Sequence, residues 1–243
     1  ATGQYLIFVD SDDYLKDGAF SFFETAIKDR QNDIVLAAYE DEHGMIHKYD
    51  IISSQYENNH ALLSCFAHGS IYTAWNKMVS TSFIKENCLF FDESLQVWED
   101  VLWSYSVAVK INSFYALPST PLYHYSSNID SVTHKKSSEE IIRNCSRSLS
   151  IIGTNLNLGN ADRDKSVLFF RNAFKHIINM TSTIDVDLQK DIYINILYDN
   201  KEILKKIYRF LPIKYMFKDL YHLFPDNISY FVCRCIFLYR RSL

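Results

Sequence analysis

The feature that most constrains this chain is an apolar run that ends in clustered acids. Residues 5–9 read Tyr-Leu-Ile-Phe-Val, and Asp10, Asp12 and Asp13 follow within four positions. Consecutive apolar residues predict a strand buried on both faces, here over residues 4–10. In open α/β sheets, ligands bind outside the carboxyl ends of the strands. Acids at this point therefore predict a binding site.

The segments that follow alternate between helix and strand patterns, and 48% of the residues are hydrophobic, enough for a sizeable core. Apolar residues spaced by three and four predict helices at residues 14–30, 54–68, 81–87 and 99–111, and the first can begin after Asp17 because Gly18 weakens its first turn. Apolar runs predict strands at residues 33–41, after Gly44, at 70–80, and as a pair hinged at Pro118 and Pro121. This alternation predicts an α/β fold.

The character of the chain changes near residue 136. Beyond it, helical patterns run to the end, and the predicted breaks are Gly153, Gly159, Pro212 and Pro225. We therefore expect two domains, a sheet domain over residues 1–136 and an all-helical region over residues 137–243.

The net charge of −4 is unevenly distributed. From residue 201 onward there are nine cations and three acids, a surplus of six, so the rest of the chain carries −10. Two interpretations remain open for this basic tail: peripheral contact with an anionic membrane surface, or an accessory helical bundle packed on the domain. Nucleic acid is not expected as a partner, because no recognised binding module accompanies the cations.

The expected location is the cytoplasm, with possible attachment to the inner face of the plasma membrane through the tail. The five cysteines are scattered without metal-site spacing, which favours reduced thiols. Residues 1–10 lack the basic segment and cleavage site of a signal peptide, and no run of about 18 apolar residues occurs.

Two carboxylates at positions i and i+2 suit a hard divalent cation such as Mn²⁺ or Mg²⁺. Water and substrate phosphates would complete its octahedron. The alternative is a solvated turn followed by a helix cap, for which Asp13 is the better candidate.

Two families carry acids in this setting. Haloacid dehalogenase-like phosphatases have an early D-x-D pair followed by Gly and Thr or Val, whereas Asp13 and Tyr14 stand here. The segment "GQYLIFVDSDDYL" more closely resembles the metal-binding D-x-D segment of family 2 glycosyltransferases, which have the GT-A fold. "AWNKMVSTSFIKENCLFFDESLQVWEDVLW" resembles their W-N-K and E-D segments, and "PLYHYSSNIDSVTH" resembles their closing segment. The three motifs occur in the family's order.

This resemblance implies an inverting transfer of a sugar from a nucleotide-sugar donor to a saccharide or lipid-linked acceptor. Asp10 and Asp12 would hold the cation that bridges the donor diphosphate. Asp100, paired with Glu99, would be the general base that takes the proton from the acceptor hydroxyl. Without the flanking motifs, Glu99 and Asp100 also fit a pair of acids at a helix N-terminus.

Further residues are implied to bind donor or acceptor. On the acceptor side these are Trp75, Asn76 and Lys77, although Lys77 also suits an ion pair with one of the acids. Trp98 fits a sugar platform or a core position equally. The segment that folds over the diphosphate would contain Tyr123, His124, Tyr125, Ser131 and His134.

The resemblance covers only the second part of the family's catalytic domain. In full-length members roughly ninety residues precede the D-x-D motif, whereas nine precede Asp10 here. We therefore expect a partial GT-A sheet, from a truncated enzyme of bacterial surface polysaccharide synthesis. The alternatives are a non-catalytic remnant or interaction module and, with less support, the phosphatase.

Overall fold

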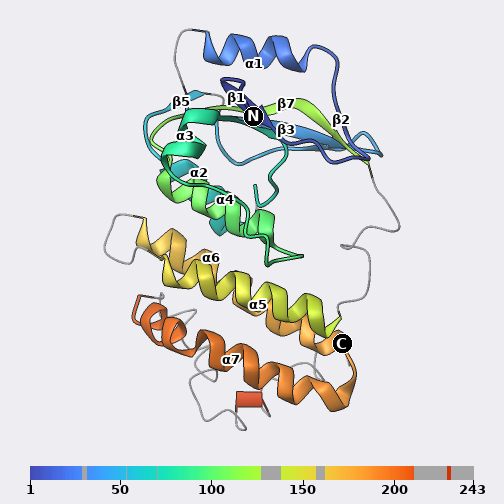
Figure 1. The fold of residues 1–243 in the computed structure, drawn as a ribbon, viewed down its shortest axis with the longest axis vertical. Coiled ribbons are helices and arrows are strands. Elements are labelled where there is room, and N and C mark those ends of the chain that lie inside the picture. The colour runs from blue at the N-terminus through green and yellow to red at the C-terminus, as the bar shows by residue number, and fades with distance from the viewer. Residues whose placement is uncertain are drawn as a thin grey trace. The chain divides into compact units, whose positions relative to one another are not determined.

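The computed structural model describes residues 1–28, 32–52, 54–69, 71–126, 138–156, 162–210 and 229–230. They belong to two compact units (Figure 1). The first, here called the sheet unit, comprises residues 1–92 and 103–135, and the second, the helical unit, comprises residues 93–102 and 136–243. Residues 93–102 thus cluster with the helices that follow them in sequence. The division into domains at residue 136 stays a prediction.

The sheet unit contains one seven-stranded mixed sheet. Its main path has the order β1-β6-β3-β7-β2, while β4 pairs with β3 and β5 with β7. The strands are β1 (Tyr5–Ile7), β2 (Tyr14–Leu15), β3 (Ile34–Asp41), β4 (Ile46–His47), β5 (Ser54–Tyr56), β6 (Lys77–Ser80) and β7 (Phe114–Tyr125). Among these described strands, β3 and β7 form the parallel pair, and the other pairs are antiparallel.

The parallel pair has an irregular register in its middle. Ala37 is opposite Leu117, Ala38 is opposite Pro121 and Tyr39 is opposite Tyr123, so residues 118–120 and 122 are extra on the β7 side. Such extra residues accommodate prolines, which cannot donate a hydrogen bond to a neighbouring strand. The two predicted strands hinged at Pro118 and Pro121 are therefore a single strand with an irregularity at the prolines.

Helices cover both faces of this sheet (Figure 1). The helix α1 (Ala19–Ile27) buries Ala19 and Phe23 against a cluster that includes Val35, Ala37 and Leu122. It begins later than residue 14, because Tyr14 and Leu15 pair with β7 and Gly18 adopts a left-handed φ of 79° at the N-cap.

The opposite face is covered by α2 (His60–Ala67), α3 (Thr81–Glu86) and α4 (Glu99–Lys110), of which residues 99–102 count with the helical unit. The predicted helix over residues 54–68 starts late because residues 54–56 pair with β7 as β5. The start of α3 is capped by Ser80, whose hydroxyl accepts a hydrogen bond from the N–H of Phe83.

The helical unit contains α5 (Glu139–Thr154), α6 (Arg163–Met180), the short 3-10 helix η2 (Thr181–Thr183) and α7 (Val186–Tyr208). Gly153 was predicted as a break but lies in the last turn of α5. A Cβ atom at this position would lie 2.4 Å from Ile203 Cδ1 and 2.7 Å from Phe170 Cε2. The glycine therefore permits close packing of three helices. Among the described helices, none has the length and apolar character needed to cross a bilayer.

Candidate functional site

The predicted metal-binding acids lie on a tight turn, residues 10–13, here called the acid turn. It connects β1 to β2, and the N–H of Asp13 donates to the carbonyl of Asp10 at 3.1 Å. Asp10 and Asp12 are exposed, whereas Asp13 is half-buried. The carboxylates follow the first strand as predicted, but the expected buried strand over residues 4–10 is a half-buried edge strand that ends at Ile7.

Asp13 anchors the acid turn to the end of β7. Its Oδ2 accepts a hydrogen bond from the Tyr123 hydroxyl at 2.5 Å, and its Oδ1 accepts one from the N–H of Ser126 at 2.8 Å. It does not cap α1, because the N-cap residue of this helix is Gly18 and no side chain there accepts a hydrogen bond from the helix. Both carboxylate oxygens are thus hydrogen-bonded within the protein, while a role for Asp13 in donor or acceptor binding stays a prediction.

Tyr123 lies in β7 with a fully buried side chain. Its hydroxyl also accepts a hydrogen bond from the N–H of Asp10 at 3.1 Å, so one oxygen contacts both ends of the acid turn. Burial raises the pKa of this phenol, and the hydrogen bond to Asp13 raises it further. Tyr123 is therefore a neutral donor, located in a strand instead of on a loop that closes over a ligand.

Trp75 belongs to an aromatic stack. Its ring stacks on Tyr123 with centroids 4.6 Å apart and on Tyr125 at 5.5 Å, and it meets Tyr39 edge-on at 4.8 Å. Only 8% of Trp75 is exposed. The structure shows a packing role for this indole, and its predicted role as a sugar platform stays a prediction.

Asn76 and Lys77 follow Trp75 and are buried. Asn76 adopts a left-handed φ of 62°. Its side-chain amide donates to the Tyr49 hydroxyl, and its backbone carbonyl accepts from the N–H of Ala37 at 3.1 Å. The Lys77 ammonium donates to the carbonyl of Thr73. Left-handed residues other than glycine are uncommon and concentrate at functional sites. Asn76 and Trp98, at φ 67°, are two of four in the described residues.

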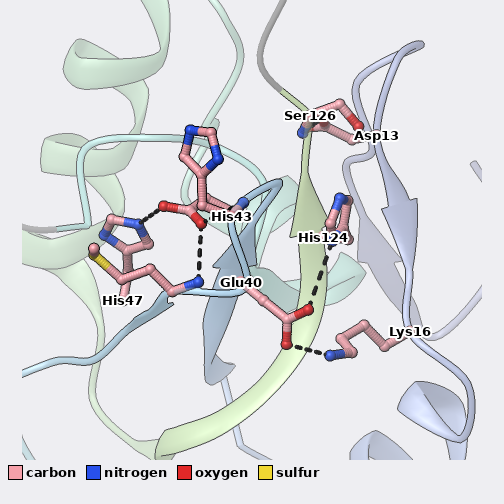
Figure 2. A network of polar contacts seen from close by, with 9 residues as sticks. Asp13, Lys16, Glu40, His43, His47, His124 and Ser126 are labelled. Carbon is pink, nitrogen blue, oxygen red and sulfur yellow. Dashed lines mark hydrogen bonds and ion pairs between the residues drawn. The ribbon is translucent and has the colours of Figure 1, made fainter.

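A polar cluster that the sequence analysis missed lies at the carboxyl end of the parallel pair (Figure 2). Glu40 of β3 is opposite His124 of β7, and its carboxylate lies 2.5 Å from Lys16 Nζ and 3.9 Å from His124 Nδ1. The His124 ring stacks on Tyr14, the residue after the acid turn, at 4.5 Å. The sequence does indicate this cluster, because Glu40 and Asp41 follow an apolar run just as Asp10 does.

Asp41 organises the hairpin between β3 and β4. Its Oδ2 lies 2.8 Å from His47 Nε2, and its Oδ1 accepts from the N–H groups of His43 at 3.0 Å and Met45 at 2.9 Å. The hydrogen bond with His47 is the main reason that the pKa of Asp41 is lowered, and the N–H of Met45 contributes next. These contacts fix the hairpin beside the carboxyl end of β7.

The predicted catalytic acids, Glu99 and Asp100, occupy the first turn of α4 and belong to the helical unit. The preceding segment is fastened to α5: the N–H of Gln96 donates to Asn144 Oδ1 at 3.1 Å, and Ser148 Oγ donates to the Trp98 carbonyl at 3.0 Å. The position also suits the alternative role as acids at a helix N-terminus.

The environments of Trp98 and Cys145 describe the surroundings of this segment. Trp98 is half-buried and stacks on His176 of α6, with ring centroids 6.1 Å apart. The pKa of Cys145 on α5 is raised to about 12, mainly by burial and further by the charges of Asp100 and Glu99. The charges of the two carboxylates thus affect the buried Cys145 thiol of α5.

The donor set of the acid turn suits a hard cation. Asp10 and Asp12 supply exposed carboxylate oxygens, and Mg²⁺ is commonly bound by one or two carboxylates together with water and substrate phosphates. No group of three or more His, Cys, Asp and Glu side chains able to hold a metal ion occurs in the part of the chain that the structure describes. Ser131, His134 and nearly all of the basic tail lie outside the described residues.

Comparisons with known proteins find likeness in structure alone. No protein-family model matches the sequence, and no curated protein matches it. The structure of S. aureus TarS 1–349 is similar with a TM-score of 0.69 and 18% identity, over 100% of this chain and 68% of that chain. Its complex with UDP gives 0.68 and 17%, over the same shares of the two chains.

The complex of S. aureus TarS 1–349 with UDP-GlcNAc is similar with a TM-score of 0.65 and 18% identity. This match covers 86% of the present chain and 60% of the TarS chain. The likeness shows the fold: an α/β glycosyltransferase-like sheet followed by a helical C-terminal region. That part of the predicted fold class is confirmed.

Proposed function

We propose that this chain carries the metal-binding and acceptor-binding part of an inverting family 2 glycosyltransferase, an enzyme that moves a sugar from a nucleotide-sugar donor to a saccharide or lipid-linked acceptor. The observation that carries the proposal is the acid turn, which presents Asp10 and Asp12 after a strand of a fold shared with TarS. Structures of TarS contain UDP-GlcNAc and UDP, which supports a donor of this class for the present chain.

Asp10 and Asp12 are the proposed ligands of Mn²⁺ or Mg²⁺. When bound, the cation would neutralise charge on the donor diphosphate as the nucleotide leaves. The chain itself contributes the orientation of the two carboxylates. Asp13 holds the turn by accepting hydrogen bonds from Tyr123 and Ser126. His124 and Lys16 bracket Glu40 beside it, so the carboxylate of Glu40 faces basic groups.

Asp100 is the proposed general base. Its carboxylate would accept the proton of the acceptor hydroxyl, which then attacks the anomeric carbon from the face opposite the leaving nucleotide and inverts it. A positioned base contributes a factor of roughly 10²–10⁴ in rate. The contacts of Gln96 and Trp98 with α5 support this role, because they fix the segment that leads into Asp100.

The test is a transfer assay with UDP-GlcNAc and Mn²⁺, comparing Asp12→Asn, Asp100→Asn and the control Glu24→Gln on the exposed side of α1. We expect Asp100→Asn to lower kcat about 10²-fold or more with unchanged donor binding. Asp12→Asn should weaken donor binding in the presence of Mn²⁺. Glu24→Gln should behave as the wild type. Absence of donor binding at millimolar concentration would instead support a non-catalytic remnant.

The remaining proposals concern the pathway, the location and the membrane contact of the protein. We propose a role in bacterial surface polysaccharide synthesis, a cytoplasmic location and peripheral contact of the basic tail with the membrane. Co-sedimentation with anionic but not neutral liposomes would support the membrane contact, and equal behaviour with both would exclude it.

A further inference from the structure

We infer that Tyr123 is a positioning residue whose hydroxyl sets the geometry of the acid turn and thereby the cation affinity of Asp10 and Asp12. The inference rests on the proposed function, since it concerns the same pair of carboxylates. It differs from the role implied by sequence resemblance, in which this tyrosine would cover the diphosphate.

The contacts of one oxygen atom carry the inference. The Tyr123 hydroxyl accepts from the N–H of Asp10 at 3.1 Å and donates to Asp13 Oδ2 at 2.5 Å, so it bridges the first and last residues of the turn. The turn is also closed by the bond from Asp13 N–H to the Asp10 carbonyl at 3.1 Å. The side chain of Asp12 lies between these fixed ends, and it is exposed.

The Tyr123 ring is itself held in place. It stacks on Trp75, is fully buried, and lies in β7 opposite Leu15 of β2. The strand that follows the turn is therefore attached to β7 through its backbone, and the N–H of Lys16 donates to the Leu122 carbonyl at 3.0 Å. Removal of the hydroxyl should leave this pairing intact and release only the turn.

Residues that orient metal-binding groups typically change metal affinity about 10–100-fold when they are replaced. A phenylalanine at position 123 keeps the ring, its stacking and its burial. It removes the hydroxyl that accepts from the Asp10 N–H and donates to the Asp13 carboxylate. We therefore expect Tyr123→Phe to raise the Kd for Mn²⁺ by about 10–100-fold.

The experiment measures Mn²⁺ binding by electron paramagnetic resonance of the free ion, with and without UDP, on the full chain. The matched control is Tyr72→Phe, which removes a hydroxyl that donates to the Phe66 carbonyl at 3.0 Å in the same unit. Urea unfolding is followed for each variant. We expect both variants to lose stability to a similar degree, and only Tyr123→Phe to lose Mn²⁺ affinity.

A second variant, Asp13→Asn, protects the test against misfolding of Tyr123→Phe. The asparagine amide has one acceptor oxygen, so it cannot accept the hydrogen bonds of Tyr123 and Ser126 on separate oxygens. This variant should therefore also weaken Mn²⁺ binding. Unchanged Mn²⁺ affinity in folded Tyr123→Phe and Asp13→Asn, or an equal loss in Tyr72→Phe, would overturn the inference alone. A wild-type chain that binds no Mn²⁺ in either condition would overturn both the proposed cation site and the inference.

Discussion

The acid turn of the sheet unit and the contact between α5 and its neighbours in the helical unit depend on different interactions. In the sheet unit, the acid turn is fixed by hydrogen bonds to Tyr123 and Ser126 at the end of β7. In the helical unit, α5 packs so closely on its neighbours that Gly153 has no room for a methyl group. The acid turn is thus set by polar contacts, whereas the position of α5 is set by apolar packing, and the segment before Asp100 is joined to α5 by hydrogen bonds.

This difference separates two effects that mutagenesis often confuses. Loss of a polar contact at the acid turn should change ligand affinity more than folding, because the strands around it are paired independently. Loss of packing in the helical unit should act on folding first, and one route by which it would affect Asp100 is the segment that hydrogen-bonds to α5. The comparison can therefore be tested by measuring stability and Mn²⁺ binding side by side.

The largest expected effect is that of Phe170→Ala in α6. Phe170 is fully buried, and replacement of a buried phenylalanine by alanine typically lowers the free energy of unfolding by about 3–5 kcal/mol. The control is Phe20→Ala on α1, where the side chain is 69% exposed. Urea unfolding should show a large loss for the first variant and little for the second. Amide exchange of folded Phe170→Ala should stay unchanged at the acid turn, and faster exchange there would break the comparison.

The next effect is that of Gly153→Ala. The added methyl group overlaps Ile203 and Phe170, and overpacking of this kind typically lowers the free energy of unfolding by about 1–3 kcal/mol. Because Ile203 Cδ1 is the nearest atom, at 2.4 Å, Ile203→Val should relieve part of the strain.

The double variant provides the control for Gly153→Ala. We expect it to be more stable than the sum of the two single losses predicts, as measured by urea unfolding. Strict additivity would mean that the helices move apart instead of competing for space at this contact.

A smaller effect is expected for Asn76→Ala in the sheet unit. Asn76 has a left-handed φ of 62°, and this conformation costs an ordinary residue such as alanine roughly 1–2 kcal/mol. Asn76→Gly removes the same hydrogen bond to Tyr49 without the backbone penalty. Thermal unfolding should therefore rank wild type and Asn76→Gly above Asn76→Ala. Equal stability of the two variants would show that the amide, and not the backbone, accounts for the loss.

Sequence patterns predicted the elements whose structure depends on local residues. The apolar run over residues 33–41 is β3 at Ile34–Asp41, and the periodic segment over residues 99–111 is α4 at Glu99–Lys110. The acids also lie on a turn after the first strand, because a turn is a local feature, although that strand is half-buried and shorter than the predicted buried strand over residues 4–10.

Contacts between distant segments could not be predicted in this way. Tyr123 and Asp13 are 110 positions apart, and their bond exists only because β2 pairs with the end of β7. The strand β2 has two residues, too few for a periodic pattern, so its segment was assigned to a helix. The residue type of Asn76 permits a left-handed backbone, but its hydrogen bonds with Tyr49 and Ala37 join distant segments and have no local sequence pattern.

The smallest expected effect concerns Asp41 and its dependence on pH. The hydrogen bond with His47, followed by the N–H of Met45, lowers the pKa of this carboxyl in the folded state. In the unfolded chain an aspartate titrates near pH 3.9. The stabilisation is therefore fully present above about pH 3.9 and is lost as the pH falls through the lower folded-state pKa.

Asp41→Asn removes this pH-dependent contribution and keeps the size of the side chain. Urea midpoints measured between pH 2 and pH 7 should show the wild type ahead of Asp41→Asn above about pH 4, with the difference shrinking in more acidic buffer. Glu24→Gln, on the exposed side of α1, is the control for general charge effects. Because Asp41 orders the hairpin through His43 and Met45 as well as His47, the variant should also raise amide exchange in residues 42–47. A difference between wild type and Asp41→Asn that grows toward low pH would contradict a lowered pKa of Asp41 in the folded state.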